Sequence, residues 1–183
     1  MKKSKTNNIS ETLTSIVDFF RRHRIPYALI GAMALNIYGR PRTTLDIDFL
    51  ILLDEPGFSN IKDRASTENF RIDEEWAKWN PMIAKSQARF IVNNISIDVM
   101  LPRDEHDRES LKRRTRKKIG NKMVCIIAPE DFILQKLKVG RPRDFEDAVT
   151  VLERQSGNID IPYLKEWANR LCISDELNYI LNL

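Results

Sequence analysis

Hydrophobic and polar positions along the 183-residue chain predict strands interspersed with helices. Apolar stretches with the two-residue period of a strand occur at 27–30, 45–53, 88–92, 95–101 and 122–127. Apolar residues at helical spacing occur in an N-terminal segment that ends near Arg22, at 32–38, at 58–65, at 105–119, from 129 onward, at 144–153, at 161–171 and at 175–181. The pattern therefore predicts a mixed α/β protein.

Composition places the chain among globular proteins. Hydrophobic residues make up 42% of it, which is enough for a packed core and too much for disorder. The net charge of +4 is too small to identify a partner by itself. Cys125 and Cys172 lack metal-binding or redox spacing, and no run approaches the roughly 20 apolar residues of a transmembrane helix. We expect a cytoplasmic protein with free thiols and no membrane contact.

The stretch 28–53 combines a glycine turn with two acidic residues. Gly31 follows a short apolar strand and precedes a helical segment, where glycine permits a sharp turn. Asp46 and Asp48 are two residues apart in the next strand, so their side chains point the same way. Neighbouring carboxylates repel each other, and a hard divalent cation such as Mg²⁺ removes the repulsion. The alternative is an edge strand that carries two solvated aspartates.

A longer motif surrounds this acid pair. Gly31 together with Gly39-x-Pro41-Arg42-x-Thr44-x-Asp46-Ile47-Asp48 resembles the signature of the DNA polymerase beta-like nucleotidyltransferase superfamily. The chain looks most like the minimal bacterial branch that includes the abortive-infection (AbiE) type toxins. This resemblance implies an α/β (α+β) fold with a small, mixed, twisted sheet backed by helices. Residues 1–127 would form the nucleotidyltransferase-like core, and residues 128–183 a C-terminal helical part packed on it as a single compact unit.

The same resemblance implies a site for a nucleoside triphosphate and two Mg²⁺ ions. Asp46 and Asp48 would hold the metal, and the backbone N–H groups of Gly31 and Ala32 would contact phosphates. Arg42 and Thr44 belong to the same nucleotide-binding set. The superfamily usually has a second Gly or Ser where this chain has Ala32, so a hydroxyl contact to phosphate is absent.

A third acidic residue is expected on a neighbouring strand. The segments 88–92 and 95–101 flank Asn93–Asn94 and predict an antiparallel hairpin. In its second strand Asp98 points away from the apolar face. The segment ISIDVML resembles the superfamily strand that carries the third acid. Asp98 would then complete the metal site and help to activate the acceptor hydroxyl.

Lys136 occupies an unusual position in the helix that begins at 129, because it falls within the apolar arc. Such a lysine either extends its charge to the surface or binds a phosphate in a cleft. Lys136 followed by Arg141-x-x-Asp144-x-x-Asp147 resembles the second conserved block of the AbiE-like branch. Lys136 would be a catalytic, phosphate-binding residue. Asp144 and Asp147 would either orient Lys136 or a base, or pair with nearby arginines.

The segment 105–119 reads as one charged helix ending at Gly120, with a seam of Leu111, Thr115 and Ile119. A dense basic run is most often a solvated face, but it also suits the phosphates of an RNA backbone. The candidate RNA contacts are Lys112, Arg113, Arg114, Arg116 and Lys117.

The acceptor of the implied reaction stays open at this point. The AbiE-like resemblance suggests RNA, such as the 3′ end of a tRNA, in a toxin–antitoxin setting with a cognate antitoxin protein. The alternatives are a small-molecule acceptor, as in antibiotic nucleotidyltransferases, and a non-catalytic nucleotidyltransferase-like partner or antitoxin. Trp76 and Trp79 fit either the core or the lining of a substrate cleft, and we expect the core.

Overall fold

The computed structural model describes residues 5–183, with side chains from Ile9 onward. Its helices are α1 (Lys5–Arg22), α2 (Gly31–Tyr38), α3 (Glu55–Thr67), α4 (Glu74–Trp79), α5 (Glu105–Arg113), α6 (Pro129–Val139), α7 (Pro142–Arg154), α8 (Ile161–Arg170) and α9 (Ser174–Leu181). Its strands are β1 (Tyr27–Leu29), β2 (Asp46–Ile51), β3 (Arg71–Ile72), β4 (Gln87–Val92), β5 (Ile95–Met100), β6 (Thr115–Ile119) and β7 (Lys122–Ile126).

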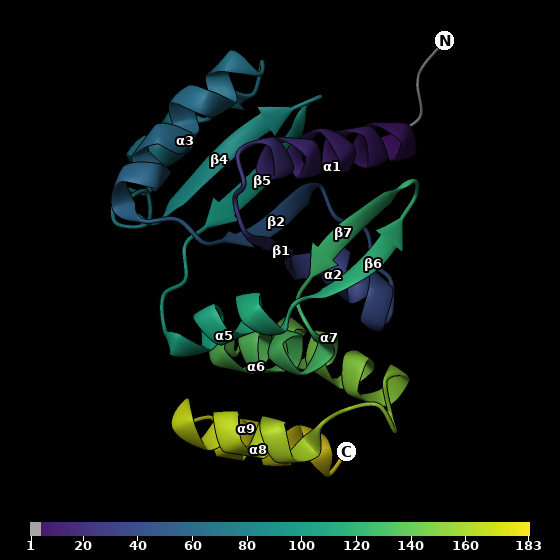
Figure 1. Ribbon diagram of the computed structural model, residues 1–183. Helices are drawn as coiled ribbons and strands as arrows, with labels where there is room; N and C mark the ends of the chain where they lie inside the picture. Colours follow the sequence, from purple (N-terminus) through teal and green to yellow (C-terminus); the bar gives the residue numbers. More distant parts are fainter. Residues whose placement is uncertain (1–4) are drawn as a thin grey trace.

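Within these residues the strands form one seven-stranded mixed sheet in the order β3-β4-β5-β2-β1-β7-β6. The central strand β2 runs parallel to β5 and antiparallel to β1, and β1 runs parallel to β7. The outer pairs β3–β4, β4–β5 and β6–β7 are antiparallel, and the last two are hairpins. Beside one end of the sheet, α5, α6 and α7 form a helical layer, and α8 and α9 lie beyond it (Figure 1). The expected α/β fold with a C-terminal helical cluster is confirmed.

The two faces of β2 explain why its acids are gathered away from the core. Phe49 is fully buried and meets Phe20 of α1 edge to face, with ring centroids 5.1 Å apart. Ile47 and Ile51 share this buried face. The carboxylates of Asp46 and Asp48 therefore lie on the opposite face, toward α2 and the helical layer. Leu45, which we expected on the apolar face, precedes the strand and is 81% exposed.

The basic segment is not one helix, so the prediction for 105–119 is wrong. Helix α5 ends at Arg113, and Arg114 has extended backbone dihedrals. Residues Thr115–Ile119 form edge strand β6, which pairs with β7 across the turn at Gly120. Thr115 and Ile119 lie four residues apart, which is one face of a helix and also one face of a strand. The apolar seam therefore could not distinguish the two structures.

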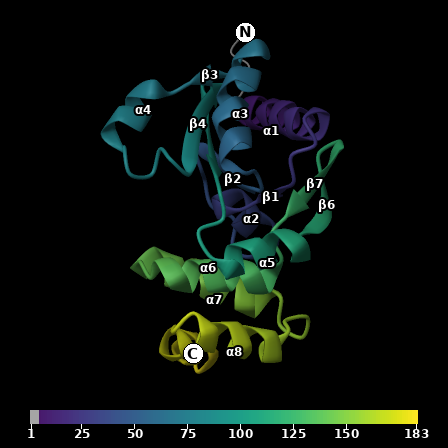
Figure 2. The same cartoon turned by 60° about the vertical axis from the view of Figure 1, so that its left-hand side comes forward.

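The prediction of core tryptophans is also wrong. Trp79 is 85% exposed, and Trp76 is only half-buried. Both belong to α4, which stands out to one side of the sheet (Figure 2).

Two other expectations agree with the structure. Cys125 and Cys172 are free thiols. Among the described residues, no helix has both the length and the apolar character needed to cross a membrane.

Candidate active site

Three carboxylates from the central strands converge on one face of the sheet. In the register of the parallel pair, Asp48 of β2 lies opposite Asp98 of β5, and Asp46 lies opposite Ser96. One carboxylate oxygen from each of the three aspartates lies within 4.8 Å of the others. The third acid expected from the sequence is therefore beside the first two.

The glycine turn is pressed against this cluster. Gly31 has a φ of +62° at the start of α2, and the Ile30 N–H donates to the Asp48 carbonyl oxygen at 2.9 Å. A Cβ at position 31 would lie 2.0 Å from the Asp48 Oδ2 atom. Only glycine permits both the left-handed backbone and this close approach of the helix to the carboxylate.

The cluster carries negative charge that the protein only partly balances. Burial, and then repulsion from Asp46 and Asp98, raise the pKa of Asp48 to about 7. Lys136 and Arg89 act in the opposite direction without cancelling the rise. The Thr44 hydroxyl donates to Asp46 Oδ1. An all-carboxylate donor set with an unrelieved charge fits a hard divalent cation such as Mg²⁺.

Arg89 is a site residue that the sequence analysis did not identify. It faces Asp98 across the β4–β5 hairpin, and its Nε and Nη2 atoms donate to the two Asp98 carboxylate oxygens at 2.7 Å each. The guanidinium carbon also lies 5.2 Å from the Trp76 ring centroid. The register gave the signal: strands flanking a two-residue turn at Asn93–Asn94 put position 89 opposite position 98.

A cavity of about 490 Å³ opens in front of the acid cluster. Its lining includes all the residues expected to bind nucleotide, namely Gly31, Ala32, Arg42, Thr44 and Lys136, and two of the three expected metal ligands, Asp46 and Asp48. Neither Asp98 nor its partner Arg89 is part of this lining. Gln87, Met100, Arg103 and Gln135 also line the cavity and were not expected.

The cavity wall opposite the acids is an ion network. Lys136 Nζ donates to Asp144 Oδ1 and Asp147 Oδ2 at 2.8 Å each. Arg42 pairs with Asp147, and Arg141 pairs with Asp144. Burial opposes ionisation of Asp144, but hydrogen bonds from Arg141 and Lys136 lower its pKa below the usual value. Three cations share two carboxylates, so this wall keeps positive charge.

Lys136 therefore does not reach out to solvent. Its side chain is 12% exposed, and its ammonium is fixed between two helix α7 carboxylates. Asp144 and Asp147 orient the lysine in this structure, and they also pair with arginines, so both of the open alternatives for these aspartates occur together.

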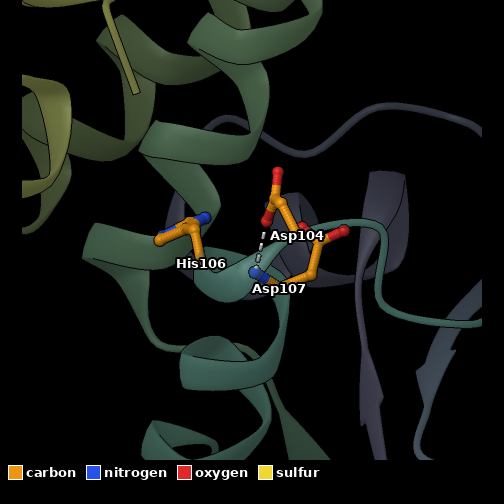
Figure 3. A group of neighbouring side chains, drawn as sticks. All are labelled: Asp104, His106 and Asp107. Carbon is orange, nitrogen blue, oxygen red and sulfur yellow. Dashed lines mark hydrogen bonds between the residues drawn. The ribbon is translucent and has the colours of Figure 1, made fainter. Parts of the chain in front are cut away.

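A second acidic group lies nearby at the start of α5. Asp104, His106 and Asp107 also present ligand atoms within 4.8 Å of one another (Figure 3). The negative charge of this group is already balanced by a lysine of the protein, Lys138. Lys138 Nζ lies 2.5 Å from Asp104 Oδ2 and 3.0 Å from Asp107 Oδ1. Burial opposes ionisation of Asp104, but the hydrogen bond from Lys138 and one from the Asp107 N–H lower its pKa.

His106 ties this second group to the helical layer. It is fully buried, and its Nε2 atom hydrogen-bonds to Asp131 Oδ1 at 3.1 Å. Asp131 also accepts hydrogen bonds from Tyr163 and Arg113. His106 Nδ1 has no hydrogen-bond partner among the described residues. Because Lys138 occupies the position between the aspartates, this arrangement does not fit a metal ion.

The structure does not gather the expected RNA contacts into one surface. Lys112 pairs with Glu109, and Arg113 donates to Glu130 and Asp131. Arg114 hydrogen-bonds to the Leu111 carbonyl oxygen, so it caps α5. Arg116 and Lys117 are exposed on β6, next to Lys118. Lysine on an edge strand also discourages pairing with another sheet.

Comparisons with solved structures identify the fold. The antibiotic-resistance factor ANT(2'')-Ia matches with a TM-score of 0.63 and 12% identity, over 94% of this chain and 97% of its own. An antigenic nucleotidyltransferase-like protein from Paracoccidioides brasiliensis matches with a TM-score of 0.58 and 15% identity, over 96% and 93% of the two chains. The lincosamide antibiotic adenylyltransferase LnuA, solved with lincomycin, matches at 0.53 and 13%, over 77% and 94%.

No protein-family model and no curated protein sequence matches this chain. The comparisons therefore establish a nucleotidyltransferase-like fold and do not distinguish a branch such as the AbiE type.

Proposed function

We propose that this chain, which has the fold of nucleotidyltransferases, transfers a nucleoside monophosphate from a nucleoside triphosphate to an acceptor hydroxyl. The observation that carries the proposal is the opposition of two charged walls across one cavity. Asp46 and Asp48 give the cavity a negative wall, with Asp98 beside them behind it, and Arg42, Lys136 and Arg141 give it a positive wall. A triphosphate with its divalent cation complements both walls.

The glycine turn supplies phosphate contacts in this proposal. The N–H groups of Gly31 and Ala32 at the start of α2 would bind the β- and γ-phosphates, helped by the helix dipole. A backbone N–H is available at Ala32 just as it would be at a serine, and only the serine hydroxyl is missing. Arg42 and Lys136 would neutralise the remaining phosphate charge, with Asp144 and Asp147 fixing their directions.

The acid cluster would hold Mg²⁺ and orient the acceptor. Asp46, Asp48 and Asp98 are the proposed ligands, and two ions are expected. When bound, the metal stabilises charge on the attacking and leaving oxygens. Asp98, at the β4 side of the cluster, would accept the proton of the acceptor hydroxyl. Residues 1–127 would thus supply the metal site, and residues 128–183 would supply Lys136 and its partners.

The proposed acceptor is RNA, such as a tRNA 3′ end in a toxin–antitoxin setting. The exposed basic strand β6 supports a polyanion. A small hydroxylated molecule is the second candidate, because one structurally similar protein is an antibiotic-resistance factor and another is an antibiotic adenylyltransferase. A non-catalytic binding partner is a weaker candidate, since the complete acid set suits turnover.

The test is transfer of label from each α-labelled nucleoside triphosphate, with Mg²⁺, to total RNA or to a panel of hydroxylated antibiotics. Labelled RNA supports the first acceptor, and labelled antibiotic supports the second. Absence of transfer to every acceptor, with nucleotide still bound, would leave the non-catalytic role.

A further inference from the structure

The third carboxylate of the acid cluster is engaged by a protein cation. Arg89 donates to both oxygens of Asp98 at 2.7 Å, a bidentate, charge-assisted geometry that is stronger than a hydrogen bond between neutral groups. The other two acids have no ion pair among the described residues: Asp46 accepts from the Thr44 hydroxyl, and the Asp48 carboxylate lies against the glycine turn at Gly31.

Direct metal coordination requires the same oxygens. A guanidinium that uses both of them leaves only the less favourable outer lone pairs for a cation. The acid cluster therefore has an open half, formed by Asp46 and Asp48 at the cavity wall, and a closed half at Asp98.

We propose that Arg89 is a positioning residue that stands in for a divalent cation on Asp98, and that a second ion binds only when Arg89 leaves. This inference rests on the proposed function, because it assumes a metal at the acid cluster. Asp46 and Asp48 then bind the first ion, and the Arg89–Asp98 pair sets the affinity for the second.

The position of Trp76 supports a guanidinium that can change partners. The ring centroid lies 5.2 Å from the Arg89 guanidinium carbon, and Arg89 is 27% exposed. A cation–π contact holds the charge close to the site without any carboxylate. Arg89 can therefore turn from Asp98 toward the ring or solvent without being left buried and unpaired.

The experiment is titration of the metal-free protein with Mn²⁺, in which electron paramagnetic resonance measures the free ion. Arg89→Met should bind the second ion about tenfold more tightly than the wild type, because a unit charge that competes for the same oxygens is removed. Arg89→Lys should lie between the two, since an ammonium cannot make the bidentate contact.

Arg103→Met is the matched control. Arg103 lines the same cavity but pairs with Asp107 rather than with the acid cluster. Its removal takes the same charge from the cavity without freeing Asp98. If the affinity for the second Mn²⁺ ion rises several-fold more in Arg89→Met than in Arg103→Met, direct competition is supported. Equal rises in affinity overturn it. The gain should also vanish in an Asp98→Asn background.

Two further outcomes separate this inference from the proposed function. If Arg89→Met binds Mn²⁺ no more tightly than the wild type while Asp46→Asn abolishes binding, the stand-in role of Arg89 is wrong and the metal site remains. If the wild type binds no Mn²⁺ that depends on Asp46 or Asp48, both proposals are wrong. Thermal unfolding with and without Mn²⁺ confirms that each variant is folded.

Discussion

Two acidic groups lie beside the same helical layer, and they differ in how their charge is balanced. The pair at the start of α5, Asp104 and Asp107, holds the ammonium of Lys138. The group on the sheet has three carboxylates and one cation, Arg89, on Asp98 alone. Burial raises the pKa of both acids, but the hydrogen bonds to Asp104 lower its pKa below the ordinary value, whereas repulsion from Asp46 and Asp98 adds to burial and raises the pKa of Asp48 to about 7. Both groups bring carboxylates close together. Of the two, the sheet group is the one whose negative charge the protein does not balance, so it is the one that favours an external cation.

Helix α6 contributes one lysine to the cavity and another to the acid pair at the start of α5, from different sides of the helix. Lys136 and Lys138 are two residues apart, which is about 200° around a helix. Lys136 meets α7 carboxylates at the cavity, and Lys138 meets α5 carboxylates outside the acid cluster. Neighbouring lysines on one helix can therefore be compared as a functional and a structural ion pair.

The largest expected difference lies between acids of the two groups. Asp46→Asn or Asp48→Asn should lower Mg²⁺-dependent transfer by about 1,000-fold or more, because the metal contributes several kcal/mol in the transition state. Asp104→Asn should leave transfer near the wild-type level, and asparagine still caps α5. Turnover would be measured at saturating nucleotide. Retained activity in both sheet variants would remove these residues from the metal site.

The two lysines should separate binding from stability. Lys136→Met should weaken nucleotide binding about tenfold to hundredfold, since a charge-assisted hydrogen bond is worth about 1.5–3 kcal/mol. Lys138→Met should leave binding unchanged and lower the free energy of unfolding by about 1–3 kcal/mol, because the buried Asp107 loses one of its two cations and keeps Arg103, while Asp104 is partly exposed. Calorimetric titration with a nucleotide and urea unfolding test this. Normal nucleotide binding by Lys136→Met would reduce that lysine to a structural role.

Stability should respond to pH in opposite directions at the two groups. Asp48 titrates at 3.8 when unperturbed and at about 7 when folded. Its stabilising contribution is therefore full below about pH 4 and is lost as pH rises through about 7, a change on the order of 4 kcal/mol. Asp104 has a lowered pKa, so its contribution is present above its ordinary pKa and is lost in acid.

Urea unfolding in EDTA between about pH 5 and pH 8 would measure the Asp48 effect. Asp48→Asn should remove the decline, and Mg²⁺ should restore wild-type stability at the upper end. A wild type that gains stability over this range without metal would contradict the assignment of uncompensated charge to Asp48.

The smallest expected effect concerns the basic edge strand. If β6 tracks an RNA backbone, each phosphate contact should add about 0.7–0.9 to the slope of log affinity against log salt. Changing Arg116, Lys117 and Lys118 to glutamine should flatten that slope by up to about 2.7 and leave nucleotide binding intact. Arg113 must stay, because it pairs with Glu130 and Asp131. Equal slopes would favour a small-molecule acceptor.

The sheet acids were predictable because strand geometry is local. A two-residue spacing fixes the face of Asp46 and Asp48, and the motif around them indicated a partner on a nearby strand. Asp98 was found for the same reason. Arg89 was equally accessible, since the predicted hairpin register already pairs it with Asp98.

Other features required tertiary information. The Lys138 pairing depends on how α5 packs against α6, and no pattern within either segment specifies that contact. The strand β6 was read as helix because a four-residue apolar spacing fits both structures and because its pairing partner, β7, lies across a glycine turn. Trp79 was placed in the core on hydrophobicity, which is unreliable for a residue in a short projecting helix.

Gly31 has a consequence for mutational scans of this protein. A scan treats alanine as the mildest change, but here the added methyl would occupy the space of the Asp48 carboxylate. The variant would have to push the acid away from its neighbours or move α2, so it would mimic loss of Asp48 rather than loss of a turn. At this position the absence of a side chain makes room for the Asp48 carboxylate, so a substitution at Gly31 tests Asp48 as much as it tests the turn.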